Sequence, residues 1–207
     1  MSADPVIKAL QLELEEWLAA DTRLCVAFSG GIDSTVLLHA LVQLLPPSRF
    51  RAVHVDHGLH PDSASWAEFC RSSCVQLTVP FELKSIKVDA DGGGGPEARA
   101  RAARYAALRA ELCPGEWLVT AHHQQDQAET FLLQLMRGAG PAGLASMSVC
   151  GERGGIVYFR PLLNVKSTAI HAYAQAAGLE WLEDPSNLDL GLDRNFLRHE
   201  VLPLLQT

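Results

Sequence analysis

A short stretch near the N-terminus, SGGIDS (residues 29–34), combines two glycines, two hydroxyl side chains and a carboxylate between an apolar run and a helix-like run. Gly30 and Gly31 permit a positive φ and leave no side chain to block a ligand. The N–H groups of the turn and of the following helical turn then point outward at the positive end of the helix dipole. Ser29 and Ser34 add hydroxyl donors. The stretch therefore predicts a binding site for an anion such as a phosphate, although it lacks the lysine and the spacing of a P-loop.

The carboxylate in this stretch, Asp33, has two interpretations. Inside a phosphate site it would hold a magnesium ion that bridges the phosphates, since Mg²⁺ prefers oxygen ligands. Alternatively, Asp33 caps the helix that follows and the glycines only make the bend.

Three further groups of polar residues have spacings that suit chemistry. Asp126 and Glu129 lie three apart on one face at the start of a predicted helix and suit a cationic ligand, although D-x-x-E is also a capping box. Arg101 and Arg104 share one stripe of the predicted helix 97–112 and suit phosphates, although a solvated, salt-bridged face would look the same. The third group is in the stretch DRNFLR, which is also compatible with an ordinary acid-capped helix; its members are Arg194, Asn195 and Arg198.

Strand-like and helix-like runs alternate along most of the chain, and these elements must position the polar groups. The predicted strands are Arg23–Ser29, Arg51–His57, Phe81–Val88 and Glu116–His123, and the predicted helices are 35–45, 62–77, 97–112 and a segment that ends near 137–143. This alternation predicts an α/β fold with a doubly wound parallel sheet and helices on both faces. SGGIDS, VDHGL and AHHQQD all follow strands, so we expect them to meet at one edge of the sheet.

The composition limits the function classes. The chain has 207 residues, a net charge of −7, 48% hydrophobic residues and no apolar run near the length of a membrane span. Five cysteines without metal-ligand spacing indicate reduced thiols and a cytoplasmic location. We expect Cys70 and Cys74 to fill the core. Any nucleic-acid partner must bind a local basic patch, since the overall charge is negative.

Six motifs occur in one order: SGGIDS, VHVDHGL (Val53–Leu59), EARARAARY (Glu97–Tyr105), residues 121–144, RPLL (Arg160–Leu163) and residues 184–205. SGGIDS resembles the pyrophosphate (PP) loop of N-type ATP pyrophosphatases, whose fold is Rossmann-like, of the adenine nucleotide alpha hydrolase type. The whole set resembles the tRNA(Ile)-lysidine synthetase family over nearly the entire chain. The resemblance implies ATP- and Mg²⁺-dependent attachment of free L-lysine to C2 of the wobble cytidine of tRNA(Ile) with a CAU anticodon, through an adenylated cytidine.

The resemblance also implies roles for individual residues. It implies catalytic roles for Asp33, Asp126 and Arg194. It implies ATP binding by Ser29, Gly30, Gly31, Ile32, Asp33, Ser34, His57 and Arg104, with Asp33 also at the metal. It implies lysine or tRNA binding by His123, Asp126, Glu129, Arg101, Asn195 and Arg198. The family usually has an aspartate where this chain has Gln125, which removes one negative charge from the site.

Residues 1–207 are expected to form the catalytic domain, with 145–207 as an extension that carries substrate-site residues. Further C-terminal tRNA-binding domains are expected to be absent from this chain, no membrane association is expected, and homodimerisation is left open. A zinc site formed by His54, His57 and His60 is disfavoured. The three residues span a strand, a glycine turn and a proline, so their side chains are not expected to point to one metal ion. The alternatives to the lysidine reaction are a tRNA thiolase, which usually carries C-x-x-C pairs that this chain lacks, and a non-catalytic ATP-binding module.

Overall fold

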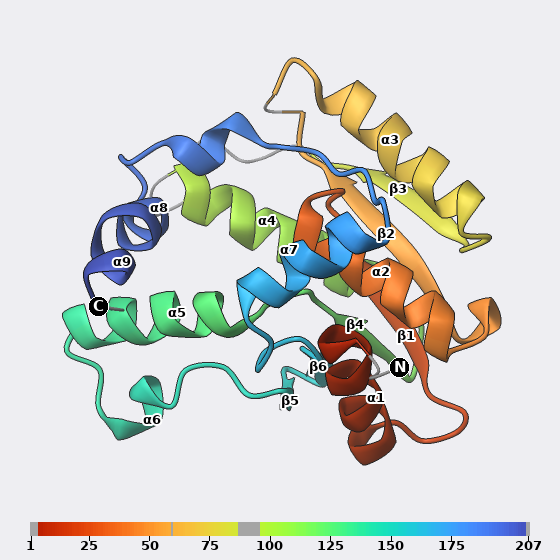
Figure 1. The fold of residues 1–207 in the computed structure, drawn as a ribbon, viewed down its shortest axis with the longest axis horizontal. Helices are drawn as coiled ribbons and strands as arrows, with labels where there is room; N and C mark the ends of the chain where they lie inside the picture. The colour runs from red at the N-terminus through yellow and green to blue at the C-terminus, as the bar shows by residue number, and fades with distance from the viewer. Residues whose placement is uncertain (1–3, 59, 87–95, 206–207) are drawn as a thin grey trace.

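A six-stranded sheet forms the centre of the computed structural model, which describes residues 4–58, 60–86 and 96–205 (Figure 1). The strands are β1 (Arg23–Ala27), β2 (Phe50–Asp56), β3 (Phe81–Ser85), β4 (Glu116–Val119), β5 (Cys150–Arg153) and β6 (Ile156–Phe159). Their order is β3-β2-β1-β4-β6-β5, in which neighbours pair in parallel except for the antiparallel β5 at the edge. The doubly wound α/β prediction is confirmed, with the addition of this antiparallel strand.

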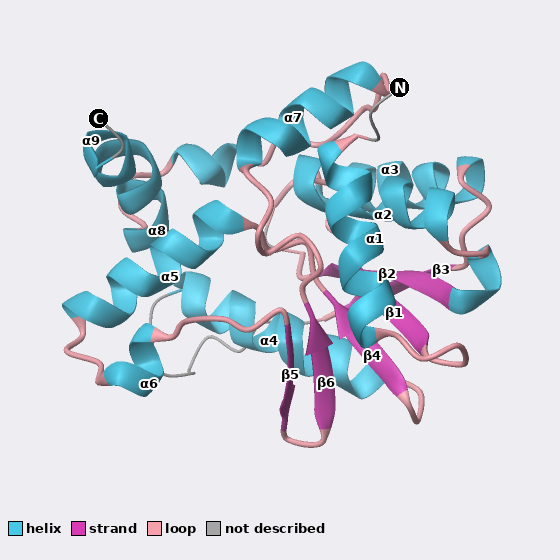
Figure 2. Ribbon diagram, turned by 60° about the horizontal axis from the view of Figure 1, so that its bottom comes forward, coloured by secondary structure: helices cyan, strands magenta, loops and turns pink. Residues whose placement is uncertain are grey.

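Helices cover both faces of the sheet (Figure 2). They are α1 (Pro5–Trp17), α2 (Ile32–Leu44), α3 (Ser63–Gln76), α4 (Pro96–Glu111), α5 (Gln124–Met136), α6 (Pro141–Leu144) and α7 (Ser167–Ala176), with a 3-10 turn at Pro47–Arg49. One face packs against α1, α2, α3 and α7, and α4 packs on the other. Alternate residues of β1 serve the two faces, as strand geometry requires: Leu24 and Val26 enter the first core and Cys25 the second. Cys70 and Cys74 are fully buried in the first core, as expected.

The direction of winding changes at β1. The chain runs from β1 outward through β2 to β3 and then returns to β4 on the other side of β1. In open α/β sheets, ligands bind beyond the carboxyl ends of the strands at such a switch point. SGGIDS follows β1 and AHHQQD follows β4, so the topology brings these two stretches together.

Several boundaries differ from the sequence expectations. β1 ends at Ala27 and β4 at Val119, which leaves the residues after each strand free to form turns. The third strand ends at Ser85, while the last two residues expected in it, 87 and 88, lie outside the described part of the chain, as does the glycine run 92–95. The β5–β6 hairpin was not expected, because its strands are four residues each and joined through Gly154 and Gly155.

The C-terminal segment consists of short helical pieces that pack against α5 (Figure 1). They are a 3-10 turn at Pro185–Leu188, α8 (Asp193–Phe196), a π-helical turn at Leu197–Val201 and α9 (Leu202–Leu205). DRNFLR is therefore helical, but a π-turn interrupts the regular helix, a feature that is frequent at functional sites. Among the described residues, no helix combines the length and apolar character needed to cross a membrane.

Candidate functional site

The turn after β1 depends on Gly30. This residue has φ +82°, and a Cβ there would lie 2.7 Å from Leu182 Cδ1 and 2.9 Å from Cys70 Sγ. The Leu182 N–H also donates to the Gly30 carbonyl at 2.9 Å, which fixes a C-terminal segment over the turn. Both the backbone conformation and the lack of space therefore require glycine at this position.

Helix α2 begins directly after the turn, at Ile32, and its N-cap is Gly31. The expected start at Thr35 is wrong, because Asp33 and Ser34 already belong to the first helical turn. The Ser29 and Ser34 hydroxyls lie 3.1 Å apart, and the Ser34 hydroxyl donates to the Gly31 carbonyl at 3.0 Å. This serine pair stands at the positive end of the helix dipole, where an anion is favoured.

Asp33 does not occupy the N-cap position that one interpretation gave it. Its carboxylate Oδ1 lies 3.5 Å from His123 Nε2, and 40% of its side chain is exposed. Asp33 thus joins the turn after β1 to the segment after β4, and part of it faces solvent at the switch point. A partly exposed carboxylate beside a glycine turn at a helix N-terminus suits a magnesium ligand.

His123 and Asp126 form a reciprocal cap at the start of α5. The Gln125 N–H donates to His123 Nδ1 at 3.2 Å, and the His123 N–H donates to Asp126 Oδ2 at 2.9 Å. The alternative in which Asp126 and Glu129 form a capping box is wrong, because Asp126 is the third residue of the helix and its capping partner is His123. Since Nδ1 accepts a hydrogen bond, the neutral ring carries its proton on Nε2, between Asp33 and Asp126 at 3.5 and 3.6 Å.

Glu129 is completely buried and pairs with two arginines from the C-terminal segment. Its Oε1 accepts from Arg198 Nε at 2.7 Å, and its Oε2 from Arg194 Nη1 at 3.4 Å. Arg198 also lies 3.5 Å from Asp126 Oδ1, and Arg194 donates to the Thr130 hydroxyl at 3.3 Å. The side chains of Arg194 and Arg198 are 22% and 30% exposed, whereas that of Glu129 is not exposed, so a ligand can reach the arginines but not the glutamate.

The pKa values of Asp33 and Asp126 are shifted in opposite directions. Burial raises the pKa of Asp33, with the nearby His123 opposing the rise and Asp126 adding to it. Burial also acts to raise the pKa of Asp126. The net pKa is nevertheless lowered, because His123, His122, the backbone N–H of His123 and Arg198 favour the ionised carboxylate. Titratable groups whose pKa values are separated in this way are typical of sites that do chemistry.

The arginines of α4 reach two different strand ends. Arg104 Nη2 donates to His57 Nε2 at 2.9 Å after β2, and Arg101 Nη2 lies 3.4 Å from His122 Nε2 after β4. No ion pair between either arginine and a carboxylate is seen among the side chains that the structure describes, which leave out that of Glu97, while Glu111 at the other end of α4 pairs with Lys84 at 2.6 Å. The two arginines lie on either side of the switch point.

Other predicted residues have partners outside the carboxylate centre. Asn195 is buried and donates both amide hydrogens to loop carbonyls, of Ser186 at 2.8 Å and Asp189 at 3.0 Å, so its side chain holds that loop. His54 is buried against the Phe28 carbonyl and His60 stacks on Trp66, so with His57 facing Arg104 the three histidines diverge. Groups of three potential metal-binding side chains are absent from the described residues.

Sequence reasoning missed one polar anchor. Gln127 forms two hydrogen bonds with the backbone of Met147, one to its carbonyl at 2.7 Å and one from its N–H at 3.0 Å. They fix α5 to the segment before β5. A glutamine on an amphipathic helix carries no signal that separates this role from ordinary exposure.

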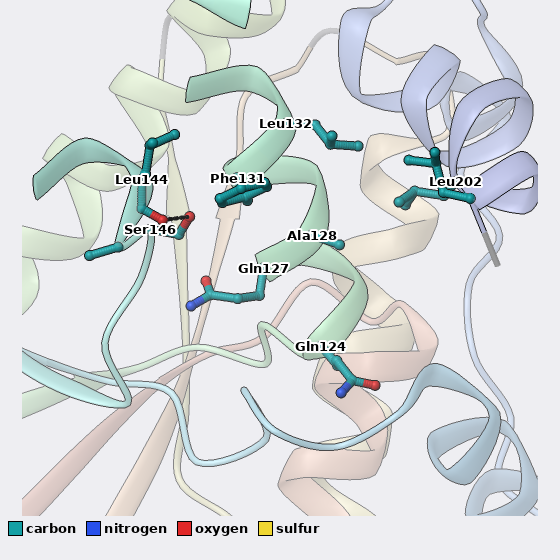
Figure 3. A pocket seen from close by; sticks show the side chains of 10 residues that line it. Gln124, Gln127, Ala128, Phe131, Leu132, Leu144, Ser146 and Leu202 are labelled. Atoms are coloured by element: carbon teal, nitrogen blue, oxygen red, sulfur yellow. Dashed lines mark hydrogen bonds between the residues drawn. The ribbon is translucent and has the colours of Figure 1, made fainter. Parts of the chain in front are cut away.

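An apolar groove of about 470 Å³ lies between α5, α6 and α9 (Figure 3). Phe131 and Leu132 of α5 line it, with Leu144 and Leu202 from the other two helices. These α5 residues are on the face opposite Asp126, so the groove is separate from the polar site.

The mostly parallel sheet, with a glycine turn and a helix N-terminus at its switch point, is the architecture of the doubly wound, Rossmann-like class of nucleotide-binding proteins. A family model described as a PP-loop domain matches residues 5–205, and the chain belongs to this family. Its fold is of the adenine nucleotide alpha hydrolase type.

Curated relatives named tRNA(Ile)-lysidine synthase are similar to this chain over most of its length. The relative from Xanthomonas campestris is 50% identical over 87% of the chain and 42% of its own length. The one from Serratia proteamaculans is 49% identical over 95% of the chain and 45% of its own length, and that from Escherichia coli O157:H7 is 48% identical over 95% and 46%. The chain thus spans less than half the length of these relatives.

Two solved structures share the fold at low sequence identity. A U34-tRNA thiolase from Methanococcus maripaludis with its [4Fe-4S] cluster has a TM-score of 0.73 at 15% identity, covering 97% of this chain and 72% of its own. An NH3-dependent NAD synthetase from Campylobacter jejuni has a TM-score of 0.54 at 15% identity, covering 97% and 84%. At this identity the likeness concerns the fold alone.

Proposed function

We propose that this chain carries the catalytic centre of a tRNA(Ile)-lysidine synthase. The observation that carries the proposal is identity near 50% to proteins of that name across 87–95% of the chain. The reaction joins free L-lysine to C2 of the wobble cytidine of tRNA(Ile) with a CAU anticodon and converts ATP to AMP and pyrophosphate. Because the substrates are tRNA and ATP, we place the reaction in the cytoplasm.

The first half-reaction is attack of the cytidine O2 on the α-phosphorus of ATP, with pyrophosphate as the leaving group. In this proposal the turn at Gly30 and Gly31 holds the phosphates with its N–H groups, and the Ser29 hydroxyl adds a donor. The Ser34 hydroxyl, which donates to the Gly31 carbonyl, fixes the turn and lies 3.1 Å from the Ser29 hydroxyl. Asp33 would hold a magnesium ion, which neutralises phosphate charge when bound. Two observations support this role: the partial exposure of Asp33 and its position beside the turn.

The second half-reaction is attack of the lysine ε-amine on C2, which expels AMP with the former O2. Asp126 is the carboxylate best placed to bind the cationic lysine, since its lowered pKa keeps it ionised. Arg194 and Arg198 present N–H groups to an anion, such as the lysine carboxylate or a phosphate. Glu129 fixes both guanidinium groups from beneath, because it is buried against them. This arrangement supports an indirect role for Glu129.

The experiment that tests the proposal is release of radiolabelled pyrophosphate from ATP in the presence of tRNA(Ile) transcript and lysine. Omission of the RNA should abolish release, and omission of lysine should leave at most one turnover. Pyrophosphate release that is the same without RNA and without lysine would show that the chain is an unspecific ATPase and would refute the proposal.

Three of the five cysteines are unsuited to carry sulfur in the thiolase alternative, whereas Cys113 and Cys150 are at least partly exposed. Cys25, Cys70 and Cys74 are buried, and burial raises the pKa of each thiol to about 12. Such thiols are protonated at neutral pH and react slowly, whereas sulfur transfer needs an accessible thiolate.

A further inference from the structure

Arg160, from the RPLL motif, has no role in the site described so far. It follows β6, and its Nη1 donates to the Ser148 carbonyl at 3.0 Å. Its guanidinium carbon lies 5.5 Å from the centre of the Tyr158 ring. Its Nε–H is buried, and the described residues offer it no acceptor. A buried donor without an acceptor is rare in folded proteins and calls for an explanation.

A second arginine is held in the same way beside it. The guanidinium carbon of Arg101 lies 5.2 Å from the Tyr105 ring centre, and the rings of Tyr105 and Tyr158 are 6.3 Å apart. Two adjacent aromatic rings therefore carry two guanidinium groups. Burial lowers the pKa of Arg160, and the charge of Arg101 lowers it further. Among the side chains that the structure describes, which begin at Arg99 in this helix, neither arginine pairs with a carboxylate that would offset the repulsion between them.

His122 connects Arg101 to the carboxylate centre. Its Nε2 faces Arg101 at 3.4 Å, and its Nδ1 lies 2.7 Å from the Thr120 hydroxyl. Because Arg101 can only donate, Nε2 must accept and the proton is on Nδ1. His122 precedes His123, the residue that contacts both Asp33 and Asp126. Arg101 is thus fixed next to the carboxylate centre, and the rings of Tyr105 and Tyr158 connect it to Arg160.

We propose that Arg101 and Arg160 bind a backbone phosphate of the substrate RNA, adjacent to the nucleotide that reacts. The inference rests on the proposed function, because it takes the RNA substrate from it. Guanidinium groups bind phosphate oxygens in a forked geometry, and a phosphate bound by the terminal N–H groups of the two arginines supplies negative charge between them.

The position favours RNA over ATP as the source of the phosphate. The ATP-binding turn follows β1, whereas Arg160 follows β6, and β4 lies between them. Two strand spacings of about 4.8 Å separate the ends of β1 and β6. Arg104 contacts His57 after β2, on the opposite side of β1, and in this proposal it binds the nucleotide. Phosphate contacts of this kind orient an RNA without reading its sequence.

The test is binding of an anticodon stem-loop RNA to the chain across a salt series, with Arg160→Gln and the matched control Arg153→Gln. Arg153 is exposed at the other end of the same hairpin, so both variants lose one arginine charge. Arg160→Gln should raise Kd about tenfold and reduce the slope of log K against log salt by about 0.7, the value for one phosphate of a single strand. Arg153→Gln should change neither, and the Kd for ATP should stay constant in both.

A second measurement leaves the protein unchanged. In a stem-loop RNA, a neutral methylphosphonate replaces one phosphate at a time. At the phosphate beside the target cytidine, this replacement should weaken binding to the wild-type chain about tenfold. Binding to Arg160→Gln should be equally strong with the modified and the unmodified RNA, because the contact is already lost. Three results would each overturn the inference. The first is an equal salt slope for Arg160→Gln and Arg153→Gln. The second is that the effects of the methylphosphonate and of Arg160→Gln add at every position of the RNA, and the third is that Arg160→Gln weakens only ATP binding. Failure of the proposed function is distinct: it appears as wild-type pyrophosphate release that does not depend on lysine or RNA.

Discussion

Replacement of Glu129 by glutamine separates two interpretations of the carboxylate. If Glu129 binds lysine directly, Glu129→Gln should raise the lysine KM and leave stability unchanged. In the structure the side chain is completely buried, and two guanidinium groups are its partners. We therefore expect the main effect on stability and on the docking of the C-terminal helices.

The magnitude follows from the partners that remain. Removal of one member of a buried ion pair typically costs about 3–5 kcal/mol. Here Arg198 keeps Asp126 at 3.5 Å, and both arginines are partly exposed, so water replaces part of the lost interaction. We expect a loss of about 2–3 kcal/mol in the free energy of unfolding. For a chain of this size, that lowers Tm by about 5–10 °C.

The assay is urea and thermal unfolding of Glu129→Gln beside Glu68→Gln. Glu68 also pairs with an arginine, Arg71 at 3.5 Å, but both side chains are largely exposed, so we expect less than about 1 kcal/mol. A double variant, Glu129→Gln with Arg198→Met, should recover part of the loss, because no uncompensated charge then remains. Unchanged stability of Glu129→Gln together with a raised lysine KM would refute this reasoning.

Three further outcomes follow from the site. Asp33→Ala should reduce pyrophosphate release by at least about 100-fold without loss of the fold, whereas unchanged turnover would assign it no part in the reaction. Asp126→Asn should weaken lysine use by about 2–5 kcal/mol with little change in ATP affinity, measured as separate KM values; equal effects on both substrates would contradict this. Burial lowers the pKa of His122 to about 4, so between pH 6.5 and 4 the unfolded chain binds more protons there and stability falls with acid. His122→Gln should flatten this part of the stability–pH curve by up to about 3 kcal/mol, and an unchanged curve would show that His122 titrates normally.

Much of the architecture could be predicted from local patterns. Alternation of apolar and helix-like runs indicated the parallel sheet, and the glycines of SGGIDS indicated a phosphate-binding turn at its edge. These signals are local, since strand and helix periodicity and positive-φ glycines depend on neighbouring residues. The β5–β6 hairpin escaped prediction because strands of four residues with glycines carry too weak a pattern.

Partner choice in the site was decided only by the tertiary structure. The sequence indicated that Asp126, Glu129, Arg194 and Arg198 matter, but not that Glu129 lies buried beneath both arginines. It placed Arg101 and Arg104 on one stripe, whereas the fold directs them to different strand ends. Residue types and helical spacing set which side chains share a face. Which charge faces which, and how much water reaches each, depends on contacts between segments more than 60 residues apart, such as Glu129 with Arg194 and Arg198, which no local pattern encodes.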